Sequence, residues 1–223
     1  ILGFVMFLWL FQWNWLRGPI GVAASARLNR TVVIAGDLEV HPWSLTPRVV
    51  ANEVRIAQPA WVRTGGDMAR LGRIVMEIEV LPLFAGRTVL PRLEIIRPRV
   101  SLIRLADGRS NWNFGGGGSG LKLPAIRHFT IIDGRLSLAD AKRKTTFAGR
   151  VFTDEVKGDS GRGGFTLKGE GLLNGGRFLA DISGDPLLNI SPDRPWPFRA
   201  DVRAGATHLV AKAKILKPFD LGR

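Results

Sequence analysis

From Thr31 onward, short stretches of the chain alternate between apolar and polar residues. Glycine, proline, asparagine or aspartate interrupts these stretches at intervals of about ten residues, which is typical of an antiparallel sheet. The 223 residues include 27 glycines and 13 prolines, which disfavour long helices. The pattern therefore predicts a mainly β protein built on an elongated antiparallel sheet with one apolar and one solvent-exposed face.

The alternation is clearest over residues 73–80, 50–56 and 165–168. In each stretch the apolar side chains are expected to point one way, and charged or polar neighbours such as Glu77 and Lys168 the other. No predicted helix layer covers the apolar side, so an apolar groove is expected there. The candidate groove residues are Val54, Ile56, Ile74, Met76, Ile78, Val80, Leu136, Leu138, Phe165 and Leu167.

Two dipeptides of the type that forms hairpin turns follow apolar stretches. Asp133-Gly134 is expected to reverse the chain after residues 129–132, and Asn174-Gly175 to reverse it before residues 178–182. Both turns predict neighbouring strands that run up and down.

An internal repeat supports a sheet that adds the same unit more than once. Residues 90–102 resemble residues 123–138 at a spacing near 33 residues. The glycine-rich stretch 115–120 lies between the two copies and is predicted to be a flexible loop, with an engineered linker as the alternative.

The first sixteen residues contain no charged side chain, and the first basic residue is Arg17. A membrane span needs about 20 apolar residues, so we expect a transmembrane helix that starts before the first residue of this sequence. Trp9, Trp13 and Trp15 lie toward its end, as an aromatic belt at the membrane interface would, together with Arg17. A cleaved signal peptide and a buried core helix are the alternatives.

These features divide the chain into consecutive parts. The expected order is an anchor at 1–16, a short helix or linker at 17–30, a first part of the groove at 31–114, the glycine-rich loop at 115–120, and a second part at 121–223 that continues beyond this sequence.

The sequence contains no recognised catalytic or metal-binding pattern. The chain has no cysteine, which excludes disulfides, thiolate metal sites and a cysteine nucleophile. It lacks a phosphate-binding glycine motif placed after a strand, a zinc-binding histidine spacing and a hydrolase nucleophile elbow. We therefore expect no enzyme activity, no cofactor and no metal.

The formal charge of +13 arises from 32 lysines and arginines against 19 aspartates and glutamates. The basic residues are spread along the chain, and the densest run is only Lys142-Arg143-Lys144. Nucleic-acid readers concentrate basic residues on one face or helix, so we expect no nucleic-acid partner. Solvent-facing strand positions explain most of the charge, and attraction to anionic lipid is the main alternative. A binder of nucleic acid or anionic polysaccharide is a weaker third hypothesis.

Several stretches, taken in order, resemble the AsmA family of bacterial envelope proteins. They are residues 15–20, 33–38, 81–87, 90–93, 97–100, 107–114 and 132–136. The resemblance implies a single-pass anchor in the bacterial inner membrane and a body in the periplasm. It also implies an elongated, curved sheet with an apolar concave face, similar in design to chorein-type lipid bridges, and no catalytic residues.

The main hypothesis is that the groove binds or conducts phospholipid acyl chains, in outer-membrane lipid homeostasis or assembly. Phospholipid, the inner membrane and further envelope proteins are then the expected partners. The alternative is a structural or assembly factor that does not transport lipid and engages envelope proteins by strand addition.

Overall fold

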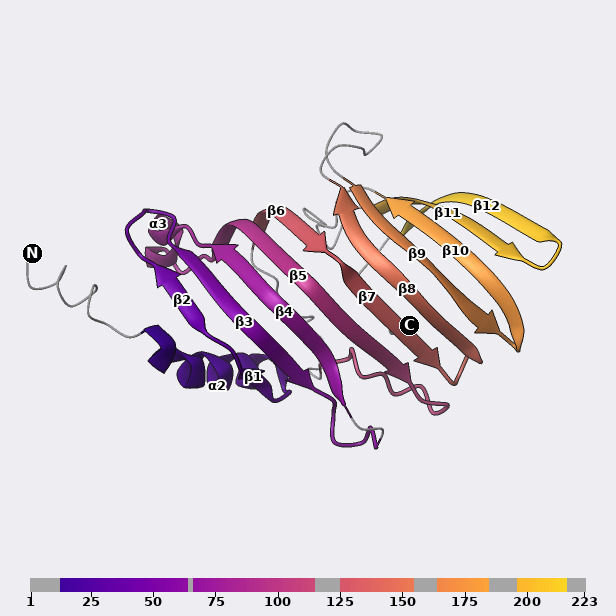
Figure 1. The fold of residues 1–223 in the computed structure, drawn as a ribbon, viewed down its shortest axis with the longest axis horizontal. Coiled ribbons are helices and arrows are strands. Elements are labelled where there is room, and N and C mark those ends of the chain that lie inside the picture. Colours follow the sequence, from indigo (N-terminus) through magenta and orange to yellow (C-terminus); the bar gives the residue numbers. More distant parts are fainter. Residues whose placement is uncertain (1–12, 64–65, 115–124, 155–163, 185–195, 216–223) are drawn as a thin grey trace, which may run out of the picture.

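A computed structural model describes residues 13–63, 66–114, 125–154, 164–184 and 196–215 (Figure 1). Within these residues, twelve strands form one open sheet. The strand order is β1-β3-β4-β5-β7-β8-β9-β10-β11-β12, while β2 pairs with β3 and β6 pairs with β5. The sheet is much wider across its strands than the strands are long, as Figure 1 shows. The expectation of a mainly β, elongated sheet is confirmed.

The helical elements are η1 (Trp13–Leu16), α2 (Arg17–Leu28) and α3 (Val80–Phe84). The strands are β1 (Val32–Ile34), β2 (Leu38–His41), β3 (Arg48–Ala57), β4 (Asp67–Glu77), β5 (Val89–Arg104), β6 (Ala125–Ile132), β7 (Gly134–Asp140), β8 (Thr145–Asp154), β9 (Gly164–Leu173), β10 (Gly176–Gly184), β11 (Trp196–Ala204) and β12 (Thr207–Ile215).

The expected short N-terminal helix is present as α2. Pro19 lies in its first turn, where a backbone N–H has no partner within the helix and its loss costs nothing. Asn29 ends the helix in a left-handed conformation at φ 48, and its N–H donates to the Ser25 carbonyl. The helix packs on one face of the sheet, against a core that includes Val32 and Val54.

The sheet is mixed, which corrects the prediction of a purely antiparallel one. β5 pairs in parallel with both β6 and β7. The hairpin predicted at Asp133-Gly134 is therefore wrong, because the chain continues in the same direction along β5. Asp133 bends the strand instead, with φ 49. A turn-forming dipeptide supplies a left-handed residue, and only the neighbouring strand decides whether that residue makes a turn or a bend.

Neighbouring strands bend at residues that lie opposite one another in the sheet. Glu53 in β3 and Arg97 in β5 have φ 50 and 52, and they lie level with Gly72 and Asp133 in the register of the sheet. The bend shifts the alternation of side chains by one position. As a result Ala51 and Val54, three residues apart, belong to the same core cluster.

The internal repeat coincides with the parallel pairing. The two copies lie side by side, and each residue of the first pairs with the residue 36 positions later, as Ile96 does with Ile132 and Arg99 with Arg135. The offset is thus 36 residues and not the expected 33. Parallel neighbours require a crossover of a dozen or more residues. The segment between β5 and β6 provides that length, and its glycine-rich residues 115–120 lie outside the described residues.

The second predicted hairpin is confirmed. Asn174 and Gly175 join β9 to β10 with φ 51 and 85, the left-handed pair that a two-residue turn requires. The strand predicted over residues 73–80 ends earlier, at Glu77, and Val80 already begins α3. Pro82 favours this change, because it lies in the first turn of the helix and has no N–H to give a strand ladder.

Candidate functional site

The register of the sheet assigns each side chain to one of two faces, since directly paired residues project to the same side. One face, which we call the apolar face, collects most of the large apolar side chains of β3 to β12. Its members include Val54, Ile56, Leu71, Ile74, Met76, Leu93, Ile95, Val100, Leu102, Phe129, Ile131, Leu136, Leu138, Phe147, Val151, Phe165, Leu167, Phe178, Ala180, Ile182, Val202 and Leu209.

Eight of the ten candidate groove residues lie on the apolar face. Leu136 and Leu138 of β7 pair with Val100 and Leu102, and the others follow in the same register. The exceptions lie past the end of β4, where the strand alternation no longer applies. Ile78 lies between β4 and α3, and Val80 is the first residue of α3.

The apolar face is closed at one end and accessible at the other. Helix α2 covers the N-terminal end, where Leu38, Ala51 and Val54 are buried. Among the described residues of β6 to β12, Ala180 is the only buried apolar side chain. Leu173 is 52% exposed and Leu209 57% exposed, whereas most other large side chains of this part, such as Phe147 and Leu167, are half-buried. Apolar surface that a compact domain would bury against a second layer is therefore within reach of a ligand in the C-terminal half of the sheet.

Two phenylalanine rings lie flat on this accessible part. Phe147 and Phe178 stack at a centroid distance of 6.2 Å. The rings lie over glycines of β9: a Cβ at Gly169 would meet Phe147 Cζ at 2.6 Å, and a Cβ at Gly171 would meet Phe178 Cζ at 2.7 Å. Glycine here gives the rings room to rest on the backbone, so this stretch of the surface is smooth and apolar.

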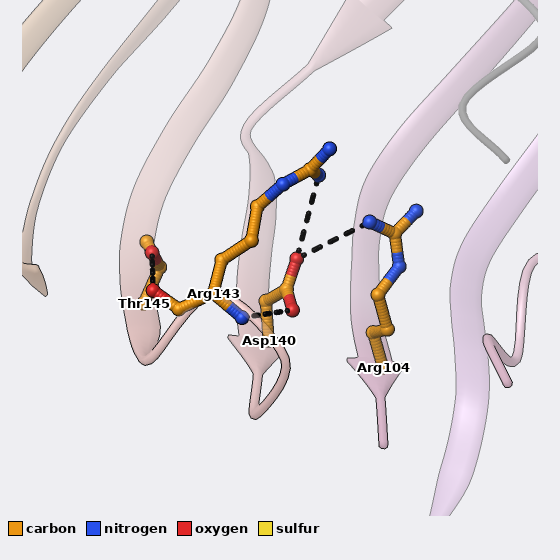
Figure 2. A network of polar contacts seen from close by, with 4 residues as sticks. All are labelled: Arg104, Asp140, Arg143 and Thr145. Atoms are coloured by element: carbon orange, nitrogen blue, oxygen red, sulfur yellow. Dashed lines mark hydrogen bonds and ion pairs between the residues drawn. The ribbon is translucent and has the colours of Figure 1, made fainter. Parts of the chain in front are cut away.

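A polar network closes the end of the apolar face between β5 and β7 (Figure 2). Arg104 Nη1 lies 3.5 Å from Asp140 Oδ2, and both side chains are buried. The Asp140 carboxylate also accepts a hydrogen bond from the Arg143 backbone N–H at 3.0 Å. The Arg104 guanidinium lies over the Trp112 ring at 5.0 Å, so the crossover segment packs against the same end of the sheet.

Asn111 fixes the crossover segment to β5. Its side chain is fully buried and donates to the Ser101 carbonyl at 2.7 Å and to Gln58 Oε1 at 2.8 Å. Its own Oδ1 accepts from the Ile103 backbone N–H at 2.9 Å. These bonds satisfy strand groups that have no neighbouring strand, so Asn111 has a structural role.

Two charged groups near the crossover segment have shifted pKa values. Burial lowers the pKa of Arg30, whose guanidinium donates to the Asn113 carbonyl at 2.9 Å and lies 5.7 Å from the Phe114 ring centre. The pKa of Asp107 is lowered because its carboxylate accepts hydrogen bonds from the Arg109 backbone N–H and guanidinium. Neither group belongs to a catalytic arrangement. Within the described ranges, no cluster of three or more His, Asp or Glu side chains could hold a metal ion.

The predicted membrane-interface residues lie at the start of the described chain, except Trp9, which is outside it. Trp15 is 70% exposed, and Trp13 is partly exposed. Arg17 donates to the Gly36 carbonyl at 3.0 Å, so it contacts the sheet. None of the helices in the part of the chain that the structure describes is long and apolar enough to span a bilayer.

The opposite side of the sheet, the basic face, carries mainly polar and charged residues. A concavity of about 980 Å³ lies on it and is lined by side chains of strands from β4 to β11, among them Arg99, Arg135 and Arg150. This hollow lies on the side opposite the apolar face, and the scattered positions of these arginines in the sequence gave no sign of it.

One open sheet, with an accessible apolar face and a basic face, defines a class of extended single-sheet β proteins. The chain belongs to the AsmA family, whose family model matches residues 1–150. It is 26% identical over 250 residues to the AsmA family protein YhjG of Escherichia coli (strain K12), a match that covers 95% of this chain. The chain spans 36% of the length of that relative. No solved structure matches.

Proposed function

We propose that the apolar face binds or conducts phospholipid acyl chains in the bacterial envelope. In this proposal the protein is anchored in the inner membrane and its body lies in the periplasm, where it serves lipid homeostasis or assembly of the outer membrane. Membership of the AsmA family supports the envelope setting. The observation that carries the proposal is the continuous apolar face of β6 to β12, on which Ala180 is the only buried apolar side chain among the described residues.

The energetics favour a hydrocarbon ligand. Burial of a methylene contributes about 0.8 kcal/mol, so a chain segment of ten methylenes gains roughly 8 kcal/mol before the cost of ordering it. Every strand from β3 to β12 adds apolar side chains to the face at the strand spacing, so contacts of one kind continue along the sheet. A chain could therefore move from strand to strand through similar contacts, without a covalent step.

The proposal can be tested by site-specific photocrosslinking in the full chain. A photoreactive amino acid replaces Leu136 or Phe165 on the apolar face, and the controls place it at Ala139 or Thr166, on the opposite face of the same strands and outside the concavity. Irradiation of the membrane-embedded protein, followed by mass spectrometry, identifies attached lipid. We expect phospholipid adducts at the first two positions and none at the controls.

The same pairs provide a second readout. Leu136→Asp should lower the amount of phospholipid that copurifies with the protein, while Ala139→Asp should leave it unchanged. Adducts at equal yield on both faces, or no adducts on the apolar face of a protein that folds normally, would exclude acyl-chain binding at this surface.

A second candidate function rests on the edge of the sheet. β12 is the last strand in the order and has one paired neighbour among the described residues, β11. Within the described part of the chain no strand pairs with the outer edge of β12, and strand addition by a protein partner at this edge is the second candidate. The test is crosslinking of the protein to an envelope protein. If Val210→Pro abolishes this crosslink and lipid adducts at Leu136 persist, the edge of β12 has an assembly role.

A further inference from the structure

A row of basic side chains crosses the basic face from strand to strand. In the register of the sheet each member lies directly opposite the next, on six strands that are neighbours in space. Adjacent strands are about 4.8 Å apart, so the row extends over roughly 24 Å. We call it the basic ladder, and its members are Arg55, Arg70, Arg99, Arg135, Arg150 and Lys168.

The protein compensates part of this charge. Arg70 pairs with Asp67 at 2.6 Å and Lys168 with Asp181 at 2.9 Å. For the other four members, no carboxylate of the described residues lies within ion-pair distance. All six side chains are exposed. Like charges directly opposite each other on neighbouring strands destabilise a sheet, so the ladder carries a cost that a bound anion would remove.

The ladder also lies in a hollow. Five of its six members, from Arg70 to Lys168, line the concavity of about 980 Å³. The concavity is lined by six basic side chains and four carboxylates, those of Asp67, Glu170, Asp181 and Asp201. Its lining therefore carries a net charge of +2, and a concave site brings its cations toward one ligand.

We propose that the basic ladder binds an anion that carries two or more phosphate groups, at a site separate from the apolar face. Five of the six members are arginines, whose planar guanidinium donates paired hydrogen bonds to phosphate oxygens. A phosphate monoester has three acceptor oxygens and close to two negative charges, so one group can bridge two neighbouring arginines. Arg99, Arg135 and Arg150 have no ion pair and lie on three successive strands, so they offer two such bridging positions, one for each of two phosphates.

Single-stranded nucleic acid is a poorer match for this face. Sites that bind it combine a basic groove with aromatic rings on which the bases stack. Phe152 is the only phenylalanine or tryptophan on the basic face among the described strand residues, and it lies outside the ladder.

The test uses isothermal titration of the full chain with sodium tripolyphosphate. The double variant Arg99→Ala/Arg135→Ala removes two central members, and Arg177→Ala/Lys212→Ala removes the same charge from exposed positions of the same face outside the ladder. A hydrogen bond to a charged group is worth about tenfold in affinity, so the first variant should bind at least about tenfold more weakly. The control should bind like the unaltered protein.

Salt and stability give independent readouts. The affinity for a polyanion falls as the salt concentration rises. By analogy with single-stranded nucleic acid, the slope of log K against log salt concentration should become shallower by about 0.7 for each lost phosphate contact, or about 1.4 for the double variant. Its melting temperature should be unchanged or higher, because like charges are removed. No binding of tripolyphosphate, an equal loss in both variants, or a lower melting temperature in the ladder variant would overturn the proposal.

A vesicle-binding experiment distinguishes two sources of the phosphate groups, a lipid headgroup and a soluble ligand. Vesicles of phosphatidylcholine are compared with vesicles that also contain cardiolipin, a lipid with two phosphates. If the protein binds the cardiolipin vesicles more tightly and the ladder variant loses this difference, the source is a lipid headgroup. If cardiolipin adds no binding while tripolyphosphate binds tightly, the ligand is a soluble phosphorylated molecule. Binding of single-stranded DNA more tightly than tripolyphosphate, through the same arginines, would overturn the assignment.

Discussion

Asp140→Ala tests whether the buried network of Figure 2 holds the end of the sheet together. The Asp140 side chain is 4% exposed, and its partner Arg104 is 7% exposed. Removal of one member of a buried ion pair leaves the other charge in a medium of low polarity, which costs about 3–5 kcal/mol. Trp112 still contacts the Arg104 guanidinium in the variant, so we expect a loss near the lower end, about 3 kcal/mol.

The expected loss can be measured as a shift in melting temperature. For a protein of this size, 1 kcal/mol corresponds to about 2–4 °C, so Asp140→Ala should melt about 6–12 °C lower. Asp140→Asn retains an oxygen that can accept the Arg143 backbone N–H, and its loss should be smaller. The matched control is Asp181→Ala. Its ion pair with Lys168 is about half exposed, and such pairs contribute about 1 kcal/mol at most.

The assay is thermal unfolding of the full chain in detergent, followed by circular dichroism in the β-sheet region. If Asp140→Ala and Asp181→Ala melt at the same temperature, burial of the network contributes nothing and the argument is refuted.

Three further predictions concern single positions. Asn111→Ala removes a fully buried hub of hydrogen bonds and should lower the free energy of unfolding by about 3 kcal/mol in urea titration. Gly171→Ala places a methyl group against the Phe178 ring and the Thr146 carbonyl and should destabilise the sheet by about 1–3 kcal/mol in the same assay. The carboxylate of Asp107 should titrate below its ordinary pKa by NMR, and Arg109→Ala should raise that pKa.

Much of the fold follows from local sequence signals. The alternation over residues 50–56 and 165–168 predicts which side chains share a face. The structure places Val54, Ile56, Phe165 and Leu167 on the same face of the sheet. The Asn174-Gly175 turn follows from the left-handed preference of both residues. The helix ending at Leu28 follows from an early proline and a left-handed asparagine at its end. These signals act within a few residues of the chain, so they can be recognised without knowledge of the neighbours.

The prediction at Asp133 failed because its conformation is compatible with two outcomes. A left-handed residue between two apolar stretches can make a hairpin or a bend, and the parallel neighbour β5, with its own bend at Arg97, decides for the bend. The repeat in the sequence signalled similarity of the two copies. It gave no sign of whether they pair with each other, since the crossover that permits parallel pairing has no local signature.

The sequence by itself determined that this chain has strands with one apolar and one polar side, a short helix before them, and an excess of positive charge. Only the tertiary structure decided where that charge lies. Arg55 and Lys168 are 113 positions apart in the sequence, yet both belong to one row, because each strand pairing aligns a single residue with its neighbour. Register depends on long-range pairing across the whole sheet, whereas alternation depends only on adjacent residues.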